Sequence, residues 1–178
     1  MISLSVIFWT FIVLFALIGA LRGWSKELLV MFSIILALFI IQVVQSYVPL
    51  VSRMLASSDA RGQFFLWSLA VCFFAFFGYH APTVNKLASV KLMTPRDRLQ
   101  DWLLGGILGA CNGYLLVGTI LYYLDMTGYP FPEAHISPPK QGDAVVKLIS
   151  LLPPAWLVVP YIYFAVAIAF AIIVIVFI

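Results

Sequence analysis

The chain has 178 residues, of which 64% are hydrophobic and only 10% are charged. Soluble domains carry about 25% charged residues, so this chain has too little charge to cover a soluble globule. The formal net charge of +3 comes from short clusters between apolar runs, which is typical of loops and not of a nucleic-acid-binding surface. We therefore predict an all-α integral membrane protein with no nucleic-acid partner.

Apolar runs of spanning length follow one another along the chain. About 20 apolar residues cross the hydrocarbon core, and backbone groups in lipid must be paired within the segment, so continuous runs predict helices. The first run lacks the basic start and the cleavage site of a signal peptide, and we expect it to be retained. The five expected spans are Leu4–Leu21, Leu28–Leu50, Gln63–Tyr79, Trp102–Leu124, and Ala155 or Trp156 to Ile178.

These runs predict a bundle of about five transmembrane helices in three regions. Residues 1–125 form a four-helix membrane region, residues 126–154 a Pro-rich extramembrane loop, and residues 155–178 a C-terminal transmembrane helix. Six prolines between Asp125 and Pro154 exclude a long regular helix there. We expect an extended cap with a short amphipathic helix within Asp143–Leu152, which is either a simple connector or a docking surface for another subunit.

Basic residues predict the orientation in the membrane, because cytoplasmic loops are enriched in Lys and Arg. The second and fourth loops hold four basic residues, Arg53, Arg61, Lys140 and Lys147. The first and third loops hold six, and we therefore expect these two loops in the cytoplasm. The N-terminus is then expected outside and the C-terminus on the cytoplasmic side. The six basic residues of the first and third loops are Arg22, Lys26, Lys86, Lys91, Arg96 and Arg98.

Small residues recur on one face of the fourth run. Gly105, Gly109 and Gly113 are spaced by four, and such spacing lets another helix approach closely in lipid. Asn112 lies on the same helix, and a buried amide needs a partner across an interface. The glycine face is either a packing seam inside the bundle or a homodimer seam.

The segment before the fourth run predicts a helix start outside the membrane. Thr94 is placed as N-cap, with Pro95 at the first helical position, so the helix is expected to begin near Pro95 and to protrude by about two turns. Arg98 and Asp101 are then spaced for a weak ion pair. Lys86 and Lys91 are expected along the lipid headgroups, where they anchor the chain or contact anionic lipid.

The hairpin between the first two spans carries a second polar cluster, with Arg22, Lys26 and Glu27. It should face the same side as the start of the fourth helix. We therefore expect a salt-bridge network in which Glu27 or Lys26 pairs with the base of that helix, formed by Arg96, Asp97, Arg98 and Asp101.

Two motifs carry a resemblance to a known family. They are Arg22-Gly23-Trp24-Ser25-Lys26-Glu27-Leu28, and Leu103-Leu104-Gly105-Gly106-Ile107-Leu108-Gly109-Ala110 followed by Gly113. Over about the first 125 residues, the chain resembles the colicin V production protein family of bacterial inner-membrane proteins. The resemblance implies a small multi-spanning protein linked to toxin production or export, with no established catalytic chemistry.

The chain departs from the family pattern at three places. Asp97-Arg98 is separated from Leu103-Leu104-Gly105 by four residues, or alternatively Asp101 takes the family's Asp position. Asn112 stands where relatives often carry a basic residue. The last span is not part of the usual four-helix pattern.

The remaining residues favour a non-enzymatic role. Polar residues within the spans are few and scattered, and no nucleophile–base pair or metal-ligand cluster is apparent, so we predict no catalytic residue, no metal and no cofactor. Bound lipid is expected, and His80, at the end of the third run, is a candidate ligand for haem or another pigment.

We expect an accessory or scaffold subunit of a larger membrane complex. The alternative is a small homo-oligomeric export or channel component linked to the secretion of a toxin or solute.

Overall fold

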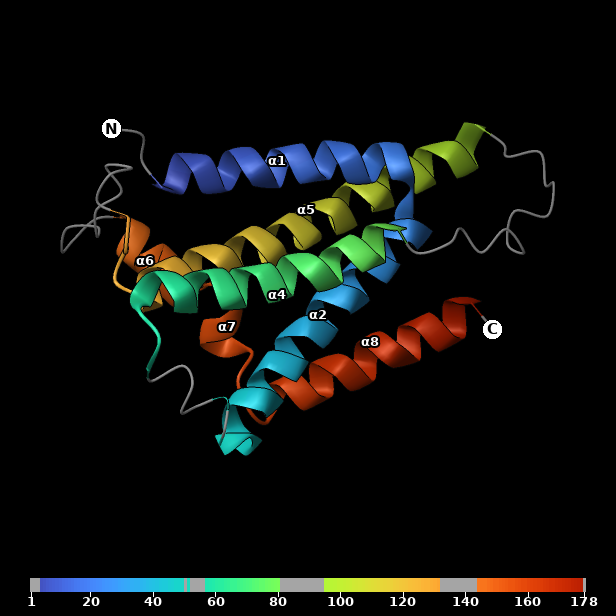
Figure 1. The fold of residues 1–178 in the computed structure, drawn as a ribbon. Coiled ribbons are helices and arrows are strands. Elements are labelled where there is room, and N and C mark those ends of the chain that lie inside the picture. The colour runs from blue at the N-terminus through green and yellow to red at the C-terminus, as the bar shows by residue number, and fades with distance from the viewer. Residues whose placement is uncertain (1–3, 50, 52–56, 81–94, 132–143, 178) are drawn as a thin grey trace.

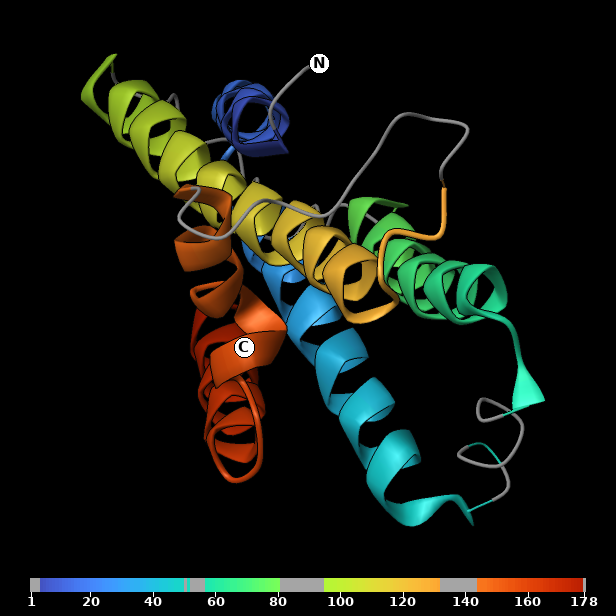
Figure 2. The same ribbon diagram turned by 90° about the vertical axis from the view of Figure 1, so that its left-hand side faces the viewer.

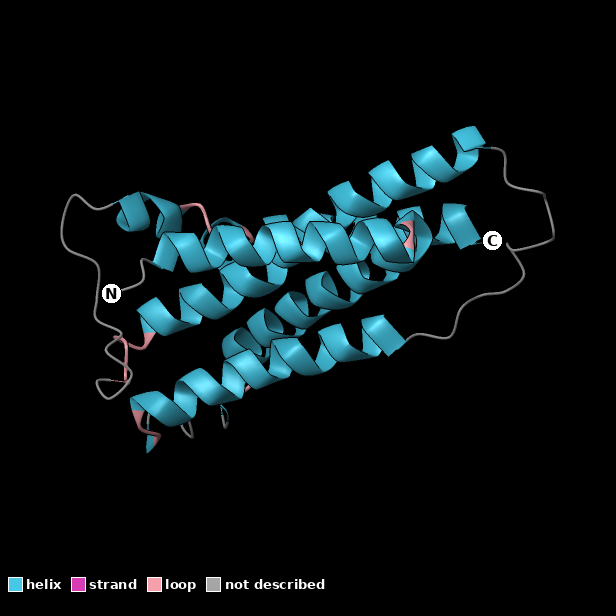
Figure 3. Ribbon diagram, turned by 90° about the horizontal axis from the view of Figure 1, so that it is seen from above, coloured by secondary structure: helices cyan, strands magenta, loops and turns pink. Residues whose placement is uncertain are grey.

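The computed structural model describes residues 4–49, 51, 57–80, 95–131 and 144–177. Within these ranges the regular structure is helical (Figures 1 and 3), which confirms the all-α fold class. The helices are α1 (Leu4–Arg22), α2 (Trp24–Tyr47), α4 (Ala60–His80), α5 (Pro95–Met126), α6 (Ala144–Ser150), α7 (Pro153–Trp156) and α8 (Tyr161–Phe177).

Four of the described helices are long and apolar enough to cross a membrane: α1, α2, α4 and α5. They coincide with the first four expected spans. α2 begins at Trp24, four residues earlier than expected, so that residues 24–28 of the hairpin motif are part of the helix. α5 has 32 residues, or about 48 Å at 1.5 Å per residue, and therefore extends beyond a hydrocarbon core of about 30 Å, as expected.

The fifth expected span is divided in two, and the prediction of one continuous helix from residue 155 was wrong. α7 ends at Trp156 and α8 begins only at Tyr161. Pro160 lies between them, and proline has no N–H for a helical hydrogen bond and clashes with the preceding turn. α8 is thus a shorter apolar helix of 17 residues.

α2 and α5 form the centre of the bundle. α5 packs against α1 on one side and α2 on the other, α4 contacts both α2 and α5, and α8 lies against α2. Figure 2 shows this order, with α1 and α8 at opposite sides of the central pair. α6 and α7 pack on α5, which confirms the short helix expected in the Pro-rich region.

The core follows from the spacing of apolar residues on α2 and α4. Val30, Ile34 and Leu38 repeat every four residues on α2, and Trp67, Val71 and Ala75 do so on α4, which places each set on one helix face. Both sets are buried against Leu115 and Tyr123 of α5. The outer faces of α1 and α4 keep large apolar side chains exposed, as the faces of a membrane bundle that point away from its core do.

Candidate functional site

The turn between α1 and α2 depends on one residue, Gly23, which has φ 89° and ψ 155°. A positive φ of this kind is readily adopted only by glycine. A Cβ at this position would also lie 2.8 Å from both carboxylate oxygens of Asp101 on α5. The hairpin therefore requires glycine for its conformation and for the close approach of α5.

The start of α2 is capped by a residue from another helix. Gly23 has no side chain with which to cap α2, and the backbone N–H of Trp24 instead donates to Asp101 Oδ1 at 3.0 Å. The first N–H groups of a helix lack partners within the helix, and negative charge is favourable there. Asp101 thus ties α5 to the first turn of α2.

Glu27, one turn into α2, is fully buried and bonded through both carboxylate oxygens. Arg22 Nη1 donates to Oε1 at 2.7 Å. Asn112 Nδ2 on α5 donates to Oε2 at 2.8 Å and to the Glu27 backbone oxygen at 3.0 Å. A buried carboxylate needs such partners to remain charged, and here α1 and α5 each supply one.

Arg22 connects the same cluster to α4. Its Nη2 donates to the backbone oxygen of Tyr79 at 2.9 Å, and its guanidinium carbon lies 4.3 Å from the centroid of the Tyr79 ring. A cation over an aromatic face is stabilised by the ring quadrupole. We call the six residues that join α1, α2, α4 and α5 the hairpin cluster: Arg22, Gly23, Glu27, Tyr79, Asp101 and Asn112.

The expected contact between the hairpin and the base of α5 exists, but its members differ from those predicted. Glu27 pairs with Arg22 and not with Arg96 or Arg98, and Lys26 is exposed. Asp101 contributes by accepting from a backbone N–H and not through a basic side chain. The pairing was mispredicted because α2 begins before Glu27, which turns that side chain inward. Arg96, Asp97 and Arg98 lie on the exposed first turn of α5.

The glycine face of α5 is covered by α1. A Cβ on Gly109 would lie 2.9 Å from the Cα of Gly19 and would collide with the backbone oxygen of Phe15, and a Cβ on Gly113 would lie 2.8 Å from Phe15 Cβ. Gly105 likewise meets the backbone of Gly19. Of the two interpretations of this face, the structure shows the packing seam inside the bundle.

The other predicted site residues lie apart from this cluster. His80, at the exposed end of α4, has Nδ1 3.1 Å from the backbone oxygen of Phe76 and its ring 3.9 Å from the Phe76 ring. Among the residues that the structure describes, no three His, Cys, Asp or Glu side chains are grouped as a metal site would need. Lys86, Lys91 and the N-cap Thr94 fall outside the described residues.

Sequence reasoning missed two members of this region, Gly19 and Tyr79. The signal for Gly19 was present, since Ala16, Gly19 and Gly23 place small residues three and four apart at the end of α1. Tyr79 could have been found from topology, because successive spans alternate in direction and the end of the third meets the end of the first.

The hairpin cluster has little capacity for chemistry. Its Glu27 carboxylate is fully buried, and each carboxylate oxygen already accepts from Arg22 or Asn112, so the group is not exposed to a substrate. Two buried atoms of the cluster, Asn112 Oδ1 and the Tyr79 hydroxyl oxygen, have no hydrogen-bond partner within the described ranges. The arrangement is that of a polar joint between four helices.

Comparison with known proteins confirms the family resemblance that the hairpin motif and the glycine face indicated. The family model described as Colicin V production protein matches residues 4–141, which include the hairpin cluster and end before α6. No curated protein and no solved structure matches the chain significantly. This family is not a known enzyme family. With more than half of its length matched, the chain belongs to the colicin V production protein family.

Proposed function

We propose that the protein is a non-enzymatic accessory or scaffold subunit of a larger complex in the bacterial inner membrane. The observation that carries this proposal is that the charged groups inside the bundle bond to neighbouring helices. Arg22, Glu27 and Asp101 each bond to a neighbouring helix or turn. These groups hold the helices together, which suits a protein that presents surfaces to others.

The surface best suited to a neighbouring subunit is the outer face of α4. It carries Phe65, Leu69, Phe73, Phe76 and Phe77, all more than half exposed. These positions recur every three to four residues and therefore lie on one side of the helix. Rigid aromatic side chains are frequent anchors in protein interfaces, so we propose an apolar helix of another subunit as the partner of this face.

The alternative role, a small homo-oligomeric export or channel component, would need an interface other than the glycine face. The Gly105, Gly109 and Gly113 face is occupied by α1, so a second copy could use it only by displacing a helix of its own bundle. A link to toxin production or export remains part of the proposal through the family, with this chain as the supporting subunit.

The first test is isolation of the native protein from its own membranes in mild detergent. We expect a complex of fixed stoichiometry, well above the 19.8 kDa of the chain. We expect Phe73→Ala with Phe77→Ala to release the partner. The control is Phe164→Ala with Ile168→Ala, which removes two similarly exposed apolar side chains from α8.

A species that contains only this chain would overturn the accessory role and direct the work to flux assays in liposomes. Release of the partner by the α8 control as readily as by the α4 pair would contradict the assignment of the face. A visible absorption spectrum of the same sample tests the pigment expected at His80, and loss of any such band in His80→Ala would assign it.

A further inference from the structure

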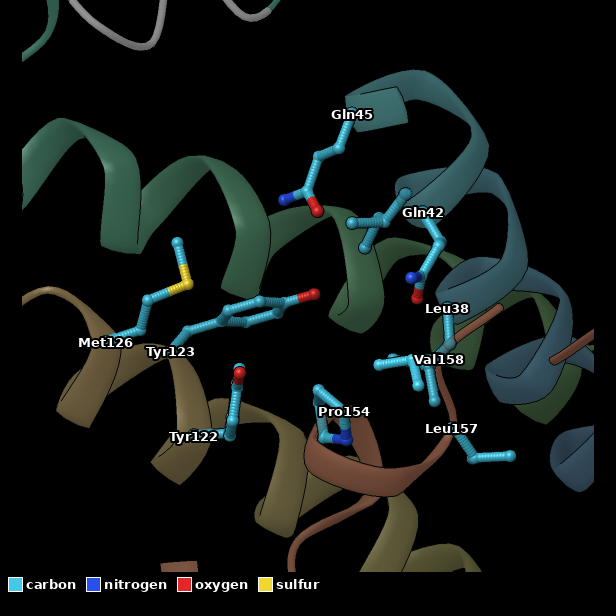
Figure 4. A pocket seen from close by; sticks show the side chains of 10 residues that line it. Leu38, Gln42, Gln45, Tyr122, Tyr123, Met126, Pro154, Leu157 and Val158 are labelled. Carbon is cyan, nitrogen blue, oxygen red and sulfur yellow. The ribbon is translucent and has the colours of Figure 1, made fainter. Parts of the chain in front are cut away.

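A pocket of about 130 Å³ lies between α2, α5 and the segment around α7 (Figure 4). Its residues on α2 and α5 are near the ends of these helices, and the hairpin cluster is at the opposite end of the bundle. A site for one water needs about 10–15 Å³ on this measure, so the pocket accommodates several waters or a small functional group. α2 contributes Gln42 and Gln45, α5 contributes Tyr122 and Tyr123, and Pro154 and Leu157 close the other side.

The wall formed by α7 is held firmly against α5. Pro153 sits in a notch at Gly118, where a Cβ would lie 2.9 Å from Pro153 Cδ. Tyr114 on α5 donates to the backbone oxygen of Leu151 and accepts from Trp156 Nε1 at 3.0 Å. The pocket is therefore preformed, as small-molecule sites usually are.

The pocket contains hydrogen-bonding groups that face its interior. The Tyr123 side chain is only 4% exposed, and its hydroxyl points into the pocket toward Gln42 (Figure 4). Among the residues that the structure describes, the Tyr123 hydroxyl is not one of the buried atoms that lack a partner, so it opens into the pocket. The Tyr123 hydroxyl and the half-buried Gln42 amide can therefore donate to an occupant that accepts from them.

The lining specifies an uncharged occupant. Phenol hydroxyls and carboxamides are its polar groups, beside Leu38, Ile41 and Leu157, and none of the lining residues that the structure describes carries a charge. Phenol O–H and amide N–H groups donate to carbonyl oxygens. The apolar residues next to them suit an acceptor attached to a hydrocarbon body.

The depth of the pocket agrees with a lipid-soluble ligand. Gln42 precedes the last residue of α2, Tyr47, by five positions, which is about 7.5 Å along the helix. The interfacial layer between hydrocarbon and water is about 5–7 Å thick on each side of the membrane. With the end of α2 taken as the outer edge of this layer, the pocket lies at the depth at which lipid molecules hold their carbonyl groups.

We propose that this pocket binds the carbonyl group of an uncharged lipid-soluble molecule, with the Tyr123 hydroxyl and the Gln42 amide as donors. Two classes of molecule carry this chemistry, acylglycerols through their esters and quinones through their ring. The inference rests on the pocket alone and is independent of the accessory role proposed above.

The test is titration of the full-length protein in detergent with two probes, decyl-benzoquinone and dioctanoylglycerol, followed by calorimetry. We expect saturable binding of at least one probe, weakened about three- to tenfold by Tyr123→Phe and by Gln42→Leu, the usual effect of one neutral hydrogen bond. Tyr163→Phe is the matched control, because it removes an exposed phenol hydroxyl outside the pocket.

The two probes separate the possible sources. Binding of the quinone alone assigns a quinone site, and binding of the diacylglycerol alone assigns an ester-lipid site. Absence of saturable binding to both probes would overturn the proposal, as would binding that Tyr123→Phe and Gln42→Leu leave unchanged. Thermal unfolding of each variant verifies that a loss of binding is not a loss of fold.

Discussion

Glu27 is the fully buried charged side chain of the hairpin cluster. Its carboxylate is fully buried, and its charge is balanced by Arg22, whose side chain is 24% exposed. Removing one partner of a buried ion pair is strongly destabilising, because the other charge stays behind without compensation. The stability of the hairpin cluster therefore depends on the negative charge of Glu27 more than on its shape.

We predict that Glu27→Gln lowers the free energy of unfolding in detergent by about 3 kcal/mol. The amide keeps the size of the side chain but cannot accept from both Arg22 and Asn112. The control is Lys26→Gln, an exposed neighbour, for which we expect a change within about 0.5 kcal/mol. Thermal unfolding followed by circular dichroism measures both, and equal stability of the two variants would contradict the role given to Glu27.

Asn112 supplies a second residue-scale prediction, based on the order of two variants. Asn112→Leu removes the donors to Glu27 and should cost about 1–3 kcal/mol. Asn112→Asp should cost more, because it places a second carboxylate where Nδ2 now lies 2.8 Å from Glu27 Oε2. Chemical denaturation of the two variants gives the order, and an Asp variant more stable than the Leu variant would exclude a charged Glu27.

At the scale of residues, the sequence predicts which residues form the hairpin cluster better than it predicts which of them bond to each other. The spacing of Arg22, Glu27 and Asp101 relative to the spans predicts that they meet at one end of the bundle, as they do. Which of them pair depends on where α2 begins and how closely α5 approaches Gly23. Both follow from backbone contacts between helices that no single sequence segment contains.

At the scale of elements, hydrophobic length predicts the first four spans, and the break in the fifth run was missed. That run is apolar throughout, so its composition does not distinguish one helix from two. The break is set by Pro160, which cannot continue the helix. From the sequence, the partner of the glycine face was left open between another helix of the same bundle and a second copy of the chain. Only the backbone contact between Gly19 and Gly109 distinguishes them.

The α1–α5 seam gives a prediction with a control at the adjacent residue. A Cβ at Gly105 would collide with the backbone oxygen of Gly19, whereas a Cβ at Gly106 would make ordinary contacts of 3.6 Å with Ala16 and Ala20. Both changes to alanine favour the helix equally. We therefore expect Gly105→Ala to be less stable than Gly106→Ala by about 1–3 kcal/mol, the usual cost of overpacking.

Thermal unfolding of the two variants in one detergent measures this difference directly. Because the helix-propensity gain is common to both, it cancels in the comparison, and the remainder reports the contact with α1. Equal unfolding temperatures would mean that α1 does not occupy the glycine face in the folded protein and would reopen the homodimer interpretation.

At the scale of the whole molecule, the helices place basic side chains unequally at the two ends. The end with the hairpin cluster carries Arg22 and Lys26, and α5 begins there with Arg96 and Arg98. α8 also ends at this side (Figure 1). Since basic residues are retained on the cytoplasmic side, we propose that this end faces the cytoplasm and that the C-terminus is inside.

The orientation can be tested by fusing green fluorescent protein or alkaline phosphatase after Ile178. We expect a fluorescent and phosphatase-inactive fusion. The six basic residues of this side exceed those of the other side by two, so Arg96→Gln with Arg98→Gln makes the numbers equal and should give mixed orientations. Asp97→Asn is the control, because acidic residues contribute little to topology, and it should leave the fusion pattern unchanged. Phosphatase activity in the unmodified fusion would reverse the assignment, and a pattern insensitive to the double arginine change would show that the loop charges do not set it.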